Sequence, residues 1–93
     1  YIRQQKTVKA LQLFKRSCEL EPENTYYIYI YGVALNSTGK KEEAIKMLTR
    51  GYKLNPFDYN ISYTLAAIYN ELGDEENFKK YYQQVLNMQQ GVN

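Results

Sequence analysis

The chain has 93 residues and a formal net charge of +2, with 44% hydrophobic and 24% charged residues. This length fits one small domain, and the mild charge disfavours nucleic-acid binding. The sequence has no histidine and one cysteine, which excludes a histidine base, an internal disulfide and a Cys-x-x-Cys motif. No apolar run approaches the ~20 residues of a membrane span, so we expect no membrane insertion.

Helical patterns follow one another along the chain. Residues 5–21 carry apolar side chains at steps of three and four, which predicts an amphipathic helix that ends before Pro22. This pattern is already under way near Tyr1, so we interpret the chain as a piece of a longer protein. Gly39 and Gly73 suit left-handed helix ends, and Asp74 suits the start of the last helix. These signals predict four further helices, over residues 25–37, 41–54, 59–72 and 75–90.

The apolar faces of the helices predict the core. In the first helix the face holds Val8, Ala10, Leu11, Leu13, Phe14, Ser17, Cys18 and Leu20. In the third helix it holds Ala44, Ile45, Leu48, Gly51, Tyr52 and Leu54, and in the fourth Ile61, Leu65, Ala66, Ile68, Tyr69 and Leu72. In the fifth helix it holds Phe78, Tyr81 or Tyr82, Val85, Leu86 and Met88. We expect these faces to bury one another in a helical stack.

Residues 26–31 oppose a helical interpretation. Their sequence, Tyr-Tyr-Ile-Tyr-Ile-Tyr, is aromatic and β-branched and alternates as in a strand. Taken alone, this stretch fits strand and helix about equally well. The equivalent segment of the following repeat, 60–67, is a plainer helix. The repeat therefore favours a helix here, with weak local propensity.

The chain repeats itself with the period that separates Pro22 from Pro56. The same step relates Gly39 to Gly73, Tyr29 to Tyr63, Asn36 to Asn70 and Gly32 to Ala66. Self-similarity at a fixed period of this length is typical of stacked-helix arrays, in which each unit buries its apolar face on its neighbours. Arrays of this kind usually bind other molecules rather than transform them.

These residues resemble the tetratricopeptide repeat (TPR) family. Residues 25–58 match a complete unit, residues 59–93 a terminal unit and residues 1–24, beginning at Tyr1, the second half of a unit. The matching positions in the complete unit are Gly32, Leu35, Gly39, Ala44, Leu48, Gly51 and Pro56. The chain departs from the family pattern at Gln5, Phe78 and Gln90. The resemblance implies one all-α domain, a right-handed α-α superhelix of about two and a half repeats and five helices.

A fainter resemblance involves residues 29–39. This run is similar to one in TPR tails that follow multihaem c-type cytochrome domains in bacteria. It would place the chain in the periplasm, so the compartment stays open between cytoplasm and periplasm. It also supplies an alternative function, a structural or self-association segment of a larger protein, including a bacterial redox protein.

The resemblance implies that the first helix of each unit lines a concave groove. Helical spacing then predicts the groove residues, which are Tyr26, Tyr29, Val33, Asn36 and Ser37 in the middle unit and Asn60, Tyr63, Ala67, Asn70 and Glu71 in the last. Asparagine amides pair with a peptide backbone, and tyrosines offer flat contact area at low entropic cost. The sequence therefore predicts a protein–protein interaction module that binds a peptide. The alternative is that the rings only fill gaps between helices.

The remaining candidates are assigned structural roles. Cys18 is expected to be a buried hydrophobe, with Lys15 and Arg16 pointing elsewhere. The basic residues Lys46, Arg50 and Lys53 are expected on a solvated convex face. Leu86 and Met88 leave an apolar face on the last helix, which a missing neighbour or a second copy in a homodimer would cover. No catalytic constellation, metal site or cofactor motif is recognisable, so we expect no enzyme activity and no cofactor.

Overall fold

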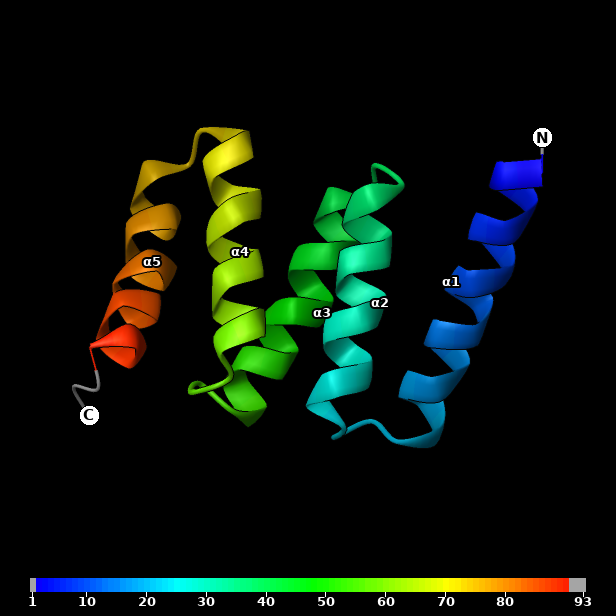
Figure 1. The fold of residues 1–93 in the computed structure, drawn as a ribbon, viewed down its shortest axis with the longest axis horizontal. Helices are drawn as coiled ribbons and strands as arrows, with labels where there is room; N and C mark the ends of the chain where they lie inside the picture. The colour runs from blue at the N-terminus through cyan, green and yellow to red at the C-terminus, as the bar shows by residue number, and fades with distance from the viewer. Residues whose placement is uncertain (1, 91–93) are drawn as a thin grey trace.

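The computed structural model describes the backbone of residues 2–90 and the side chains of residues 6–90. Within that part the chain forms five helices joined by short turns (Figure 1). They are α1 (Ile2–Leu20), α2 (Thr25–Ser37), α3 (Lys41–Leu54), α4 (Tyr59–Leu72) and α5 (Glu75–Gln89). The all-α repeat fold expected from the sequence is confirmed, and the bounds of α2, α3 and α4 are those predicted.

The two outer helices differ slightly from the prediction. Helix α1 begins at Ile2 rather than residue 5 and ends one residue earlier, and α5 ends at Gln89 instead of residue 90. Helix α1 runs through Gln5, which stands where the repeat pattern has a turn glycine, so no turn forms there. Tyr1 and residues 91–93 lie outside the described residues.

Local capping fixes the helix ends. The backbone N–H groups of Tyr26 and Tyr27 donate to Asn24 Oδ1 at 3.0 and 3.2 Å, and Asp58 and Asp74 cap α4 and α5 in the same way. Gly39 and Gly73 have φ of 83° and 76°, the left-handed conformation that glycine adopts without steric cost. Each reverses the chain within a few residues, which lets the next helix pack antiparallel.

Residues 26–31 are helical, as the repeat predicts and against their strand-like pattern. Ile28 is fully buried within α2, and Leu35 is buried on the same face further along the helix. Packing of this stripe against α3 and α4 outweighs the modest preference of tyrosine and isoleucine for strands.

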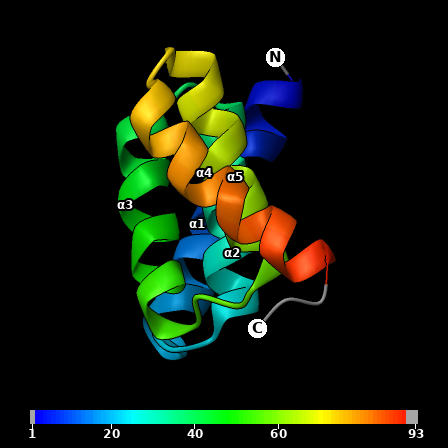
Figure 2. The same ribbon diagram turned by 90° about the vertical axis from the view of Figure 1, so that its left-hand side faces the viewer.

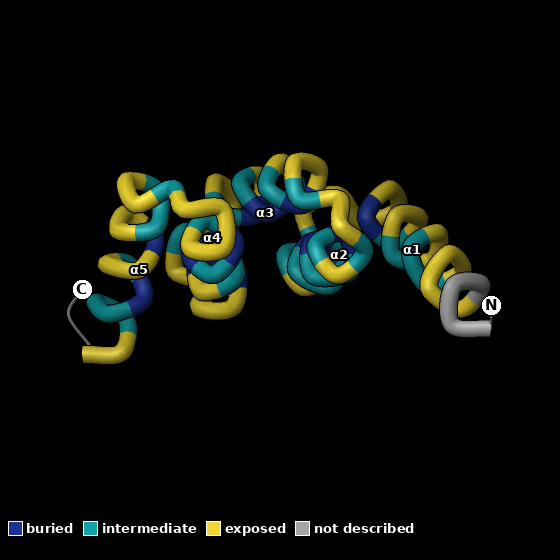
Figure 3. The backbone as a smooth tube through the Cα atoms, turned by 90° about the horizontal axis from the view of Figure 1, so that it is seen from above, coloured by how far each residue is buried: buried dark blue, intermediate teal, exposed yellow. Residues whose placement is uncertain are grey.

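The helices stack side by side into an elongated array measuring 43 × 29 × 18 Å, with α1 at one end and α5 at the other (Figure 1). Viewed from the α5 end, α3 is set to one side of α2 and α4 (Figure 2). From above, α2 and α4 form one row, here called the inner row, with α3 on one side of it and α1 and α5 at the two ends of the array (Figure 3). Helices α1, α3 and α5 form the outer row.

The core lies where the two rows meet. Its buried members are Leu35, Ala44, Leu48, Ile61, Leu65, Ala66, Ile68 and Tyr81. Close approach of the helices depends on two glycines. A Cβ atom at Gly32 would lie 2.6 Å from Leu48, and one at Gly51 would lie 2.7 Å from Ile61, so a larger residue at either position would force its neighbours to shift.

Several residues assigned to the apolar faces are not in the core. Val8, Leu13 and Leu20 of α1 are exposed, Leu20 by 74%, and so are Leu54 and Leu72. The expected stripe on α1 is wider than the strip that α2 covers, and only Cys18 on it is buried. On α5 the structure selects Tyr81, which is buried, over Tyr82, which is exposed.

Candidate functional site

The inner row presents the residues predicted to line a groove. Tyr26 and Tyr63 are 63% and 53% exposed, and Ser37, Asn60, Asn70 and Glu71 are also exposed. Tyr29, Val33, Asn36 and Ala67 are half-buried. The exposed side chains therefore come from both inner helices, and the half-buried ones lie among them on α2 and α4.

The two tyrosines related by the repeat, Tyr29 and Tyr63, differ in their surroundings. Tyr29 packs against the core cluster, whereas the Tyr63 ring stacks on Tyr59, with centroids 5.9 Å apart and planes 19° from parallel. The sequence predicted the same groove-lining role for both tyrosines. The difference has a physical reason: α4 lies beside α2, while no helix of the inner row follows α4 in the described part of the chain.

Tyr59 belongs to this surface although it was not predicted to. Its ring is 40% exposed, and its hydroxyl accepts a hydrogen bond from Gln89 Nε2 of α5 at 3.2 Å. The spacing of four residues between Tyr59 and Tyr63 on one helix was the signal available in the sequence. The Gln89 contact holds one edge of the aromatic pair in place.

Lys41 links the two inner helices at the other end. Its Nζ donates to Asn36 Oδ1 of α2 at 2.9 Å and to Glu71 Oε2 of α4 at 3.0 Å. The Asn36 side-chain oxygen is thus already engaged, and its Nδ2 group is the part left to bind a ligand. Helical spacing did not predict this link, because Glu71 is 30 residues away from Lys41.

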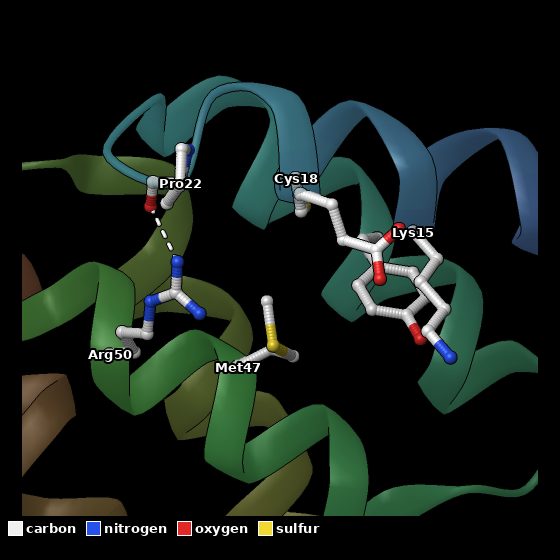
Figure 4. A pocket seen from close by; sticks show the side chains of 7 residues that line it. Lys15, Cys18, Pro22, Met47 and Arg50 are labelled. Carbon is white, nitrogen blue, oxygen red and sulfur yellow. Dashed lines mark hydrogen bonds between the residues drawn. The ribbon is translucent and has the colours of Figure 1, made fainter.

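A concave feature lies between α1 and α3, beside α2. It is a pocket of about 320 Å³ lined by Lys15, Cys18, Glu19, Pro22, Tyr31, Met47 and Arg50. Figure 4 shows Cys18 and Met47 pointing towards each other from the two helices, with Arg50 reaching to Pro22. Cys18 is buried, as predicted, but Lys15 lines the same pocket rather than pointing elsewhere.

The electrostatics of this pocket keep the thiol neutral. Burial raises the pKa of Cys18 above its ordinary value, and nearby Arg50 only partly opposes this. Burial also raises the pKa of Tyr31, helped by Glu43. A protonated thiol is a weak nucleophile and behaves as a small apolar wall.

Arg50 has a structural contact that the sequence did not reveal. It was expected on a solvated face, but its Nη2 donates to the Pro22 carbonyl oxygen at 2.7 Å. The same bond recurs one repeat later, where Gln84 Nε2 donates to the Pro56 carbonyl oxygen at 2.9 Å. Helices α3 and α5 are thus each tied to the proline turn of the unit before them.

Among the described residues, no group of three histidine, cysteine, aspartate or glutamate side chains could hold a metal ion. In the same part of the chain, every helix is too short or too polar to cross a membrane. The exposed side chains of the inner row include amides, which form hydrogen bonds, and tyrosines, which offer phenol groups and aromatic contact.

Comparison with known proteins gives two findings. The family model described as "Tetratricopeptide repeat" matches residues 26–58 and again residues 59–91. The chain is also similar to the TPR repeat-containing thioredoxin TTL4 of Arabidopsis thaliana, with 33% identity over 73 residues. The match covers 78% of this chain and 11% of that protein, so the chain spans about a ninth of the relative's length. The relative is a plant protein, and neither finding supports the bacterial origin expected from residues 29–39.

Proposed function

Because this chain belongs to the tetratricopeptide repeat family, whose repeats generally mediate protein–protein interaction, we propose that it binds a peptide segment of a partner protein along the inner row. The contact residues in this proposal are Tyr26, Tyr29, Val33, Asn36, Asn60, Tyr63, Ala67 and Asn70. Repeats of this family are generally interaction domains rather than enzymes, and the module acts by binding alone.

The observation that carries the proposal is the exposed aromatic pair on α4. Tyr59 and Tyr63 expose 40% and 53% of their surfaces although their rings stack on each other. Tyrosine is enriched at protein interfaces because it gives large contact area with few rotatable bonds to fix. A rigid, exposed pair of rings is suited to serve as the anchor of such an interface.

The amides set the polar part of the contact. Asn70 is exposed on the same helix, about two turns beyond Tyr63. Asn36 offers its Nδ2 donor, since Lys41 occupies its oxygen. Donors on α2 and both donors and acceptors on α4 match the alternating N–H and C=O groups of an extended peptide. Lys41 and Glu71 neutralise each other, so the proposal favours an uncharged peptide segment.

A peptide-display selection followed by calorimetry tests the proposal. The immobilised chain is used to select binders from a random peptide library, and the affinity of each binder is measured for wild type and Tyr63→Ala. Loss of a central aromatic anchor is expected to weaken binding by at least ~10-fold, or about 1.4 kcal/mol. Selection of no peptide, or binders indifferent to Tyr63→Ala, would contradict the proposal.

The chain offers a matched control for that variant. Tyr82 is 42% exposed on α5 and stacks on Phe78, four residues earlier, with centroids 5.2 Å apart. Tyr82→Ala therefore removes an exposed, stacked tyrosine outside the inner row, with a similar loss of local packing. Equal weakening by Tyr82→Ala and Tyr63→Ala would mean that the loss reflects stability rather than contact with the peptide.

A second candidate function is a structural or self-association segment of a larger protein. Exposed apolar side chains at the two ends favour it, namely Val8, Leu13 and Leu20 on α1 and Tyr82 on α5. On α5, Leu86 and Met88 are half-buried, so the uncovered apolar face centres on Tyr82. Sedimentation velocity over a range of concentrations tests a homodimer through the last helix. Sedimentation as a monomer at every concentration would exclude this homodimer.

A further inference from the structure

The two interfaces between successive outer helices can be compared residue by residue, because the repeat relates them. The step of one repeat carries Cys18 to Tyr52 and Met47 to Tyr81. It also carries the Arg50–Pro22 hydrogen bond to the Gln84–Pro56 hydrogen bond, with lengths of 2.7 and 2.9 Å. In both interfaces the later outer helix, α3 or α5, is therefore tied in the same way to the turn before it.

The side chains between the outer helices differ in size. Between α3 and α5, the rings of Tyr52 and Tyr81 meet edge to face with centroids 5.0 Å apart, and Tyr69 stacks on Tyr81 with centroids 5.8 Å apart. Tyr81 is buried by this arrangement. Between α1 and α3, Cys18 and Met47 stand in the places of the two rings. The pocket of about 320 Å³ lies at this position.

From this comparison we propose that the pocket between α1 and α3 is a binding site for a single phenol ring. Its volume is ample, since apolar cavities of roughly 150 Å³ accept benzene. Its walls include the neutral thiol of Cys18, the thioether of Met47 and the ring of Tyr31. Thioethers and aromatic edges make favourable contacts with an inserted ring.

The rim of the pocket suits the hydroxyl of such a ring. Lys15, Glu19 and Arg50 line it along with the apolar residues and provide both donors and an acceptor. In the second interface the corresponding sequence positions hold Thr49, Lys53 and Gln84, which are also polar. The pocket is lined by residues of α1, the following turn and α3, together with Tyr31 of α2, and none of these is among the proposed peptide-contact residues, so the two proposals can fail independently.

The methionines supply a direct reporter. The chain has two, Met47 in the pocket and Met88 on α5. With ¹³C-labelled methionine methyl groups, titration with p-cresol is expected to shift the Met47 signal saturably through the ring current and to leave Met88 unchanged. Cyclohexanol, which lacks the aromatic ring, serves as the ligand control. Absence of a saturable Met47 shift, or equal shifts of both methyl groups, overturns the proposal.

Two variants separate pocket binding from contact elsewhere. Cys18→Tyr places in the pocket the residue found at the equivalent position, and p-cresol is expected to bind it at least ~10-fold more weakly. Tyr52→Cys opens the second interface, and calorimetry is expected to give two sites instead of one. An unchanged affinity in folded Cys18→Tyr overturns the proposal. If that variant loses its helical circular dichroism, Met47→Tyr fills the pocket from the opposite wall, and retained binding there also overturns it.

The ring has two sources, a free phenolic molecule or a tyrosine side chain of a partner. N-acetyl-tyrosinamide carries the same ring on a peptide backbone. A Met47 shift with both compounds supports entry of a partner's tyrosine. A shift with p-cresol alone supports a free phenol, and either result supports the pocket as a phenol site.

Discussion

Gly32 is the position where one added methyl group tests how closely α2 packs on α3. A Cβ atom there would lie 2.6 Å from both Cγ and Cδ2 of Leu48, which is fully buried. Cγ is the branch point of the Leu48 side chain and carries both methyl carbons, so relief requires either a new rotamer of the whole side chain within a packed site or a shift of α3. Overpacking costs ~1–3 kcal/mol, whereas alanine in place of a mid-helix glycine returns about 1 kcal/mol. We expect Gly32→Ala to lower the free energy of unfolding by about 1 kcal/mol net.

A double-mutant cycle isolates the steric part of this effect. Leu48→Ala alone should cost ~2–5 kcal/mol because it empties a fully buried site. In that background the clash is gone, and Gly32→Ala should instead stabilise the chain by about 1 kcal/mol. Urea unfolding followed by circular dichroism measures all four proteins, in the same stabilising osmolyte so that the weakest stays folded.

Ala66 provides an internal comparison for the same position. It is the equivalent of Gly32 in the following repeat and is buried, but the counterpart of Leu48 there is Tyr82, which is exposed and free to yield. Ala66→Gly should therefore destabilise the chain through helix propensity and lost burial. The steric reasoning is refuted if Gly32→Ala stabilises wild type, or if it has the same effect with and without Leu48.

Three further changes have definite expected outcomes in the same unfolding assay, and a fourth is read by hydrogen exchange. Gly73→Ala should cost about 1 kcal/mol, because φ is 76° and no atom lies within 4 Å of the added Cβ, so only backbone strain acts. Hydrogen bonds from Asn77 lower the pKa of Asp74 below its ordinary value of 3.8. The ionised carboxylate therefore stabilises the fold above pH 3.8, and this stabilisation is lost as the pH falls through the lowered pKa. Asp74→Asn should make the free energy of unfolding less dependent on pH in this acid range, and an unchanged pH dependence would contradict this expectation. Ser62→Ala should stabilise by about 1 kcal/mol, since the Ser62 hydroxyl is fully buried without a hydrogen-bond partner. Arg50→Ala should speed amide hydrogen exchange in α1 relative to α4, and equal exchange would show that its bond to the preceding turn contributes nothing.

Much of the fold could be predicted because its signals are local. Pro22, Gly39 and Gly73 act on their own backbone, and Asn24 and Asp74 cap groups two or three residues away. These interactions give the same result wherever the segment packs. The strand-like run over residues 26–31 was the exception, and there the internal repeat supplied the longer-range information that local propensity lacked.

The candidate sites were predicted less completely. Helical spacing placed Tyr63 and Asn70 on one face, but it could not show that Tyr29 packs on the core while its equivalent Tyr63 stacks on Tyr59. It also gave no sign of Lys41 joining the inner helices. The pocket was not predicted, because Cys18 was considered only within its own helix. It was not compared with Tyr52, the larger residue at the equivalent position of the next repeat.

The sequence by itself determined the repeat period, the bounds of the three middle helices and the turns, since these depend on backbone conformation and hydrogen bonds within a few residues. The tertiary structure alone decided which part of each apolar stripe is covered, which of Tyr81 and Tyr82 is buried, and where the outer helices leave a pocket. Those outcomes depend on contacts such as Arg50 with Pro22 and Lys41 with Glu71, whose partners are 28 and 30 residues apart. Residues so far apart in the sequence come into contact only when the helices pack, so the space left between their side chains is decided at that stage.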